Sequence, residues 1–169
     1  MAESIADTVA TPEAVFGKEA VTAALAEHAA VKGLASLIVD AKWDRKELTL
    51  TVAPETIVAA MQAAKAAGYN FLEDVTAVDW YPTEPRFQIS YSVLSHALKQ
   101  RIRVVARLSE GQSIASITSV WPSANFYERE VFDLFGVNFT GHPNLTRIMM
   151  PENWEGHPLR KDYPVEGYR

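Results

Sequence analysis

Apolar and polar residues alternate in several segments of the chain, and this period of two predicts strands. Leu48, Leu50 and Val52 are separated by single polar residues, as in a strand with one buried face. The same period runs through residues 87–93 and 102–108, which a short polar connection joins into a hairpin. Two further segments, 34–40 and 71–80, are candidate strands because of their high apolar content. The predicted strands are residues 34–40, 47–52, 71–80, 87–93 and 102–108.

Capping residues and apolar positions three to four residues apart predict three helices. Proline at a first helical position opens the first two, because it has no N–H to lose there. Glycine follows each apolar run, where a left-handed residue ends a helix. On the first helix, His28 is expected to be a hydrogen-bonded core residue rather than a ligand. The predicted helices run from Thr11 to Gly33, from Pro54 to Gly68, and from Ser123 or Asn125 to Phe135, with Gly136 as the stop.

The chain divides into three parts. Residues 1–10 are small, polar and acidic, which is typical of a flexible tail. Residues 11–136 carry the predicted elements and form a single α/β domain. Four prolines interrupt residues 137–169, yet this part keeps large side chains such as Trp154 and Tyr163, in which disordered tails are poor. We therefore predict an α/β fold of the two-layer α+β type, with one mixed β-sheet packed against helices and an extended, irregular C-terminal interaction arm.

The amino-acid composition argues against several kinds of functional site and partner. The 169 residues include no cysteine, which excludes disulfides, iron–sulfur ligation and cysteine nucleophiles. The eight glycines are not clustered, so a phosphate-binding loop is not expected. A net charge of −5 disfavours a nucleic-acid partner. No apolar run approaches the ~20 residues of a membrane span, and the acidic N-terminus is unlike a signal peptide. We expect a compartment like the cytoplasm, with membrane contact only through a partner.

Two Gly-His-Pro sequences place His142 and His157 in the C-terminal arm. With Asp133, Glu155 or Asp162 they offer one set of candidate metal ligands. The two histidines are far apart for a structural zinc site and have no cysteine beside them. Each also precedes a proline, which favours extended backbone at the histidine. We predict that both histidines are hydrogen-bonded anchors of turns and that the chain has no metal site.

The third predicted helix has an apolar arc wider than one sheet needs, and Glu128 falls inside it, between Phe132 and Phe135. A buried carboxylate needs a cation or several hydrogen-bond donors. Two interpretations remain open. Either Glu128 reaches water at the edge of the arc, or the helix is clasped between its own sheet and a partner, with arginines of the arm or of another subunit beside it. The opposite, polar side is expected to hold Arg129, Glu130 and Asp133.

A row of arginines occupies one face of the last predicted strand, at positions 101, 103 and 107. It is either a solvated sheet face or a docking patch for an acidic partner. The first interpretation is favoured, because charged side chains on a sheet also protect it from aggregation.

The third helix and the arm also resemble a known family. They carry FYEREVFDLFGV at residues 126–137, GHPNLTRIM at 141–149 and WEGHPLRKDYP at 154–164. These runs resemble the signature of the C subunit, or 30 kDa subunit, of the proton-pumping NADH–quinone oxidoreductase, respiratory complex I. Residues 12–120 agree with that family in length and in the order of helices and strands.

The resemblance implies a hydrophilic, non-catalytic subunit that binds no cofactor, with FMN and iron–sulfur clusters held by partner subunits. It implies a place in the peripheral arm, beside the large quinone-site subunit and neighbouring iron–sulfur subunits. That complex couples electron transfer from NADH to quinone with proton translocation. Its peripheral arm is expected on the cytoplasmic face of a bacterial plasma membrane, or on the matrix or stromal side in an organelle. The chain would hold its neighbours in the geometry that electron transfer needs.

The resemblance assigns residues to contacts with other subunits and none to catalysis. A basic residue is usual in the family at the position of Thr146, which leaves open whether Arg147 takes over a salt bridge there. Two other identities remain. One is a homologous subunit of a membrane-bound hydrogenase or of a ferredoxin-using cyanobacterial or chloroplast complex, and the other is a freestanding small-molecule enzyme or binding protein. The residues expected at the interface are Tyr127, Glu128, Arg129, Glu130, Asp133, His142, Arg147, Trp154, His157, Arg160, Lys161 and Asp162.

Overall fold

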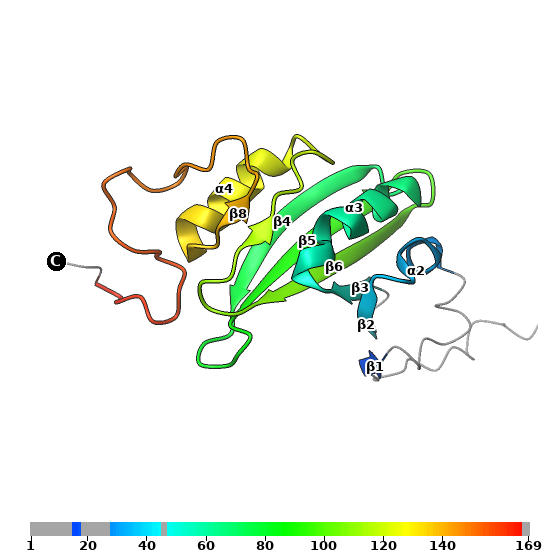
Figure 1. Ribbon diagram of the computed structural model, residues 1–169, viewed down its shortest axis with the longest axis horizontal. Helices are drawn as coiled ribbons and strands as arrows, with labels where there is room; N and C mark the ends of the chain where they lie inside the picture. The colour runs from blue at the N-terminus through cyan, green and yellow to red at the C-terminus, as the bar shows by residue number, and fades with distance from the viewer. Residues whose placement is uncertain (1–14, 18–27, 45–46, 167–169) are drawn as a thin grey trace, which may run out of the picture.

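The computed structural model describes residues 15–17, 28–44 and 47–166. Its centre is a six-stranded sheet with the order β1-β2-β3-β6-β5-β4 (Figure 1). β3 and β6 pair in parallel and the other neighbours are antiparallel, so the sheet is mixed, as predicted. The strands are β1 (Val15–Gly17), β2 (Ile38–Asp44), β3 (Glu47–Val52), β4 (Phe71–Asp79), β5 (Phe87–Ser95) and β6 (Gln100–Leu108).

The helices pack against this sheet and confirm the predicted α+β class. α3 (Ile57–Ala66) lies over one face with α2 (Ala29–Leu34) beside it, and α4 (Ala124–Phe135) lies next to β4 (Figure 1). A 3-10 turn, η1 (Pro54–Thr56), leads into α3. The short strands β7 (Ile114–Ala115) and β8 (Phe139–Thr140) form a separate parallel pair. Apolar residues of α3, of α4 and of the sheet belong to one buried core.

Most elements lie where the apolar pattern and the capping residues predict them. β3 has the predicted bounds, and β5 and β6 form the predicted hairpin. Pro54 opens the turn before α3, and Gly68 lies just beyond that helix with a φ of 99°. Gly136 directly follows α4 with a φ of 75°. This left-handed backbone favours glycine and ends a helix.

The strand predicted at 34–40 is displaced to Ile38–Asp44. The residues before it complete α2 and its final turn, where Leu37 N–H donates to Leu34 O at 2.8 Å. Leu34 is buried, but it faces the core from a helix. A short apolar run does not by itself distinguish a strand from the end of a buried helix.

The helix predicted from Thr11 to Gly33 is wrong at residues 15–17, and its residues 11–14 and 18–27 lie outside the described part of the chain. Residues Val15–Gly17 form a strand that pairs with β2, in agreement with the strand preference of valine and phenylalanine. From His28 to Gly33 the prediction is confirmed, because α2 follows His28, whose Nδ1 accepts from the Ala30 N–H. His28 is therefore a hydrogen-bonded cap. The predicted tail at 1–10 lies outside the described residues.

Gly33 lies inside α2 rather than at its end. A Cβ built on Gly33 would be 3.0 Å from the Cβ of Ala67, which follows α3. The missing side chain therefore allows α2 and α3 to approach closely, and the glycine has a packing role instead of a terminating one.

After α4 the chain makes β8 and then turns through residues 141–166, with no further helix or strand in this described stretch. Figure 1 shows this segment beside α4, at one end of the sheet. No helix in the described residues is long and apolar enough to cross a membrane.

Candidate functional site

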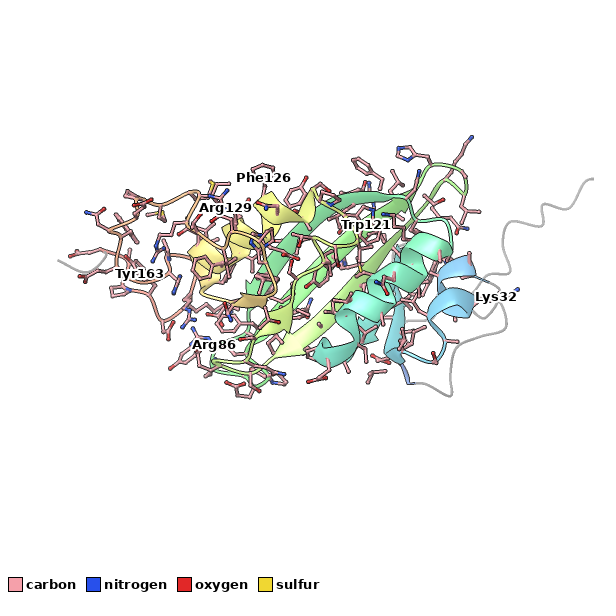
Figure 2. The ribbon with its side chains drawn as sticks, turned by 45° about the horizontal axis from the view of Figure 1, so that its top comes forward. Lys32, Arg86, Trp121, Phe126, Arg129 and Tyr163 are labelled. Carbon is pink, nitrogen blue, oxygen red and sulfur yellow. The ribbon has the colours of Figure 1, made fainter. Side chains whose placement is uncertain are left out.

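Many of the expected interface residues lie on α4 or on the segment that follows it. Residues 146–163, which we call the clasp, contact the C-terminal half of α4, the end of β4 and the turn before β5. In Figure 2, Arg129, Arg86 and Tyr163 lie toward this end of the molecule, and Lys32 lies at the opposite end. The clasp is therefore held by its own chain before any partner is considered.

Asp133 is the central acceptor of the clasp. One carboxylate oxygen accepts from the backbone N–H groups of Ile148, Met149 and Met150 at 2.8–2.9 Å. The other oxygen lies 2.6 Å from Nη1 of Arg147. Burial would raise the pKa of Asp133, but these four donors outweigh it and lower that pKa below its ordinary value. Asp133 was expected on a polar face, but it is fully buried because the clasp covers that face.

The clasp also caps the C-terminal end of α4. The last carbonyl groups of a helix have no partner inside the helix. Here His157 Nδ1, Leu159 N–H and Arg160 Nε donate to the last three carbonyls of α4, at 2.9, 3.0 and 2.6 Å. The guanidinium of Arg160 also places a positive charge at the negative end of the helix dipole.

Arg147 and Arg129 hold the beginning of the clasp. Arg147 Nη2 donates to the carbonyls of Trp154 and Gly156, each at 3.0 Å. Arg129 Nη2 donates to Oγ1 of Thr146 at 3.1 Å and to the Arg147 carbonyl at 3.0 Å. Arg147 therefore makes the salt bridge with α4, and Thr146 is a hydrogen-bond acceptor.

A second group of charges fixes the end of the clasp to the sheet. Arg86, after the β4–β5 turn, makes two hydrogen bonds to Asp79 at 2.9 and 2.8 Å. The same guanidinium lies 2.6 Å from both Asp162 and Glu110. The Lys161 N–H donates to Asp79 at 2.9 Å. One arginine thus joins the sheet, the loop after β6 and the clasp.

Two carboxyl groups of this second group, those of Asp79 and Asp162, have pKa values below the ordinary value. Burial would raise the pKa of Asp79, but the hydrogen bonds from Arg86, from Lys161 N–H and from Tyr81 N–H lower it to about 2. Arg86 also lowers the pKa of Asp162, and the carboxylates in turn raise the pKa of Arg86. Sequence reasoning did not single out Asp79, Arg86 or Glu110, because each lies outside the motif and its partners in the clasp are distant in the chain.

The first interpretation offered for Glu128 is wrong, and the second is wrong for the arginines of the arm, whereas contact of α4 with a partner subunit stays a prediction. Its side chain is 0 % exposed, so it does not reach water at the edge of the arc. Its partners are not arginines: Oε2 accepts from Ser116 Oγ at 2.6 Å and Oε1 accepts from the Ile117 N–H at 2.7 Å. The loop between β7 and α4 therefore supplies the donors. Within the described chain, α4 is clasped by its own sheet and its own C-terminal segment.

The two histidines of the Gly-His-Pro sequences anchor turns, as predicted. His142 Nδ1 accepts from the Asn144 N–H at 3.1 Å, and its Nε2 lies 3.2 Å from the Asn125 carbonyl. His157 donates to the end of α4. Among the described residues, no group of three or more His, Cys, Asp or Glu could hold a metal ion.

Two arginines of the row on β6 pair with acids of other strands of the sheet. Arg101 lies 2.6 Å from Glu73 on β4, and Arg103 lies 3.1 Å from Glu47 on β3. Arg107 lies over the ring of Trp80. These contacts favour the interpretation of a solvated sheet face, because the positive charges are largely balanced within the chain.

Large apolar side chains remain exposed around the clasp. Phe126 of α4 is 62 % exposed, and Figure 2 shows it on the outer side of that helix. Met149 is 61 % exposed. Ile148, Trp154 and Leu159 are also exposed. Contiguous exposed apolar groups mark interaction sites in soluble domains. The predicted interface residues Tyr127, Glu130 and Lys161 also keep exposed surface, whereas Glu128 and Asp133 can act only by shaping it.

Comparison with known proteins identifies the family. Residues 50–169 match the family described as the 30 Kd subunit of respiratory-chain NADH dehydrogenase. The chain belongs to that family. It is 47% identical over 135 residues to the C subunit of NADH-quinone oxidoreductase from Citrifermentans bemidjiense, covering 79% of this chain and 84% of the relative. It is 46% identical to the C subunit from Rhodobacter capsulatus, covering 78% of this chain and 67% of the relative.

Two solved structures are similar to this member of the 30 Kd family. One is a trypsin-resistant fragment of Nqo5, with a TM-score of 0.55 and 35% identity, covering 59% of this chain and 83% of the fragment. The other is a chain in the membrane-bound sulfane sulfur reductase, an archaeal respiratory membrane complex, with a TM-score of 0.70 and 25% identity. That match covers 79% of this chain and 82% of the archaeal chain.

Proposed function

We propose that this chain is the C subunit of a proton-pumping NADH–quinone oxidoreductase and that its role there is structural. The observation that carries the proposal is the family match over residues 50–169, which includes α4 and the whole clasp. The chain catalyses no step and binds no cofactor; FMN and the iron–sulfur clusters belong to partner subunits. It is a peripheral subunit, on the cytoplasmic face of the membrane in a bacterium.

The geometry of the clasp supports a structural role. Its contacts are ion pairs, capped helix carbonyls and backbone hydrogen bonds, which fix the shape of an irregular segment. A segment that is ordered before binding loses less conformational entropy when a partner binds. The clasp therefore presents its exposed side chains in one arrangement, as a docking surface for rigid neighbours.

The partner surface is built around the exposed apolar residues of α4 and the clasp. A hollow of about 510 Å³ lies beside them, lined by Trp154, Pro158, Lys161, Tyr163 and Val165 among others. Aromatic side chains such as Trp154 and Tyr163 are enriched in the centres of protein interfaces. The large quinone-site subunit is the main partner, with iron–sulfur subunits as further neighbours.

A second candidate function rests on the archaeal structure. The chain in the sulfane sulfur reductase complex has the higher TM-score of the two solved structures, 0.70. The same fold thus serves in a respiratory membrane complex with a different name and substrate. The alternative is therefore a role as the corresponding subunit in a hydrogenase-like or ferredoxin-using relative of the complex.

Affinity purification of the tagged chain from native membranes in mild detergent tests the proposal. We expect a large iron–sulfur complex to co-purify and to oxidise NADH with added quinone. The same complex with hydrogenase or ferredoxin-dependent activity and no NADH oxidation would favour the second candidate. A chain that purifies alone, as a soluble monomer, would contradict both.

A further inference from the structure

Glu128 is a buried carboxyl group that the clasp does not use. It lies on α4 with its side chain 0 % exposed. Its two oxygens face the loop after β7, where Ser116 Oγ and the Ile117 N–H are the donors. Both donors are neutral, so hydrogen bonding compensates a negative charge here only in part.

The nearest basic side chain does not supply the missing charge. His142 Nε2 lies 3.9 Å from Oε2 of Glu128, and in the described residues no other basic side chain is within 4.0 Å. His142 Nδ1 accepts from the Asn144 N–H, and its Nε2 lies 3.2 Å from the Asn125 carbonyl. Both ring nitrogens therefore have hydrogen-bond partners other than Glu128.

On the sheet side, the group within electrostatic reach of Glu128 is the phenol of Tyr91. Tyr91 on β5 is fully buried, and its hydroxyl has no hydrogen-bond partner. Burial, and after it the charge of Glu128, raise the pKa of Tyr91 well above its ordinary value, so the phenol stays neutral. Buried polar groups without a partner are rare, and this one lies within the electrostatic reach of the carboxyl group.

The hydroxyl groups beside Glu128 can serve a protonated carboxyl as well as an ionised one. Ser116 Oγ lies 2.6 Å from Oε2 of Glu128 and 2.8 Å from Thr118 Oγ1. When the carboxyl is ionised, Ser116 donates to it. When the carboxyl is protonated, it donates to Ser116 Oγ, which turns its own proton to Thr118. In both states Oε1 accepts from the Ile117 N–H.

We propose that Glu128, Ser116 and Thr118 form an internal proton-binding site, in which the folded chain holds on the Glu128 carboxyl a proton that an exposed glutamate would release. The proton is taken from water when β7, the following loop and α4 close together, and it returns to water when they separate. No other group is consumed or released. The site is independent of the proposed function, because it uses only contacts within this chain.

The strength of proton binding agrees with this geometry. Burial raises the pKa of Glu128 from 4.5 to about 7, against the opposing effect of the hydrogen bonds from Ser116 and Ile117. A proton is therefore bound on the order of 10²-fold more tightly than by an exposed glutamate. At higher pH the lost proton leaves a buried charge, which favours separation of the loop from α4.

Carboxyl ¹³C NMR of the full chain, labelled at glutamate, tests the site from about pH 4 to about pH 9. We expect one glutamate carboxyl resonance with a midpoint near 7. That resonance should be absent from Glu128→Gln. It should remain in Glu130→Gln, which changes an exposed carboxyl two positions along the same helix.

A further variant keeps the test decisive if Glu128→Gln does not fold. Ser116→Ala removes a donor to the ionised carboxyl, so the same midpoint should move upward, by about one pH unit. If no glutamate carboxyl of the unsubstituted chain titrates above about pH 6, the proposal is wrong. It is also wrong if the near-neutral resonance persists in Glu128→Gln or does not move in Ser116→Ala.

Discussion

The carboxylate of Asp133 on α4 and the guanidinium of Arg147 in the clasp lie 2.6 Å apart, and each is also held by backbone groups. Asp133 accepts from three backbone N–H groups, and Arg147 donates to two carbonyls beyond it as well as to the Asp133 carbonyl. Removing either charge leaves the other, a fully buried Asp133 or a largely buried Arg147, beside groups arranged for the ion pair. The ordered conformation of the first part of the clasp therefore depends on one residue of α4, Asp133.

Asp133→Asn keeps the size of the side chain and removes its charge. We expect the free energy of unfolding to fall by about 3–5 kcal/mol, because Arg147 loses its counter-ion and the three N–H groups keep at most one neutral acceptor. Urea unfolding measures the loss, and limited proteolysis should cut the clasp first. The control is Glu130→Gln on the exposed side of α4, which should change stability by less than about 0.5 kcal/mol. Equal effects of the two substitutions would contradict the central role of Asp133.

Gly136→Ala tests how closely the clasp approaches the end of α4. A Cβ at Gly136 would lie 2.6 Å from the ring of His157 and 2.7 Å from Nη2 of Arg160. Gly111 has the same φ of 75°, but a Cβ there would meet nothing within 4 Å. Gly111→Ala should therefore cost only the backbone strain of about 1–2 kcal/mol. Gly136→Ala should cost clearly more and loosen the clasp. Similar midpoints of thermal unfolding for the two variants would contradict this, because they would show that His157 and Arg160 move away from an added Cβ at little cost in free energy.

Stability should fall on the acid side because of Asp79. Its pKa is lowered from 3.8 to about 2 in the folded chain, so its contribution is present above pH 3.8 and is lost as the pH falls toward 2. A lowering of this size corresponds to about 2–3 kcal/mol of stability. The pKa values of Asp133 and Asp162 are lowered as well and add to the effect. Urea unfolding between about pH 2 and pH 5 measures this loss of stability. In Asp79→Asn the free energy of unfolding should depend less steeply on pH over that range.

Stability should also fall as the pH rises toward neutrality, because of Glu128. Its folded pKa lies above the unfolded value, so its favourable contribution is complete below pH 4.5 and is lost as the pH passes about 7. The expected change is a few kcal/mol at most. In Glu128→Gln this decline should disappear, whereas the loss of stability at acid pH that comes from Asp79 should remain. A stability that rises steadily from pH 5 to about pH 8 would be the opposite of what burial of this group predicts.

Phe126 tests the proposed docking surface. The side chain is 62 % exposed on α4, and Phe71, at the far end of β4, is 49 % exposed. If partner subunits bind at α4 and the clasp, Phe126→Ser should reduce their recovery with the tagged chain by about tenfold, the effect of losing one large interface contact. Phe71→Ser should leave recovery unchanged. Equal recovery with both variants would place the interface elsewhere.

Local patterns were sufficient for the regular elements of the domain. The alternation of Leu48, Leu50 and Val52 predicts β3 to the residue, and Gly136 ends α4 where a left-handed residue is needed. The pattern failed where a short apolar run, such as the one beginning at Leu34, fits both a helix end and a strand. The burial of Leu34 depends on the packing of α2 against α3, and α3 lies outside the short sequence window that was read.

The contacts of the site were less predictable than the elements. The motif contains Asp133 and Arg147, but a helical wheel places Asp133 on a solvent face because it treats the helix as lying on the sheet alone. Glu128 lies in the apolar arc as expected, and its donors come from the loop after β7, whose position is set by pairing with β8. Arg86 and Asp79 meet the clasp through contacts between distant segments that no local pattern encodes.

The parallel pairing of β3 with β6 determines the order in which the chain can fold. β3 has β2 on one side, but its other edge is covered only by residues 102–106, which are synthesised later. At about 5–20 residues per second, that edge stays open for several seconds on the ribosome. An uncovered edge is a template for pairing with other chains. The growing polypeptide therefore passes through a period in which the open edge of β3 can pair with other chains. That period ends when β6, in its hairpin with β5, pairs with β3.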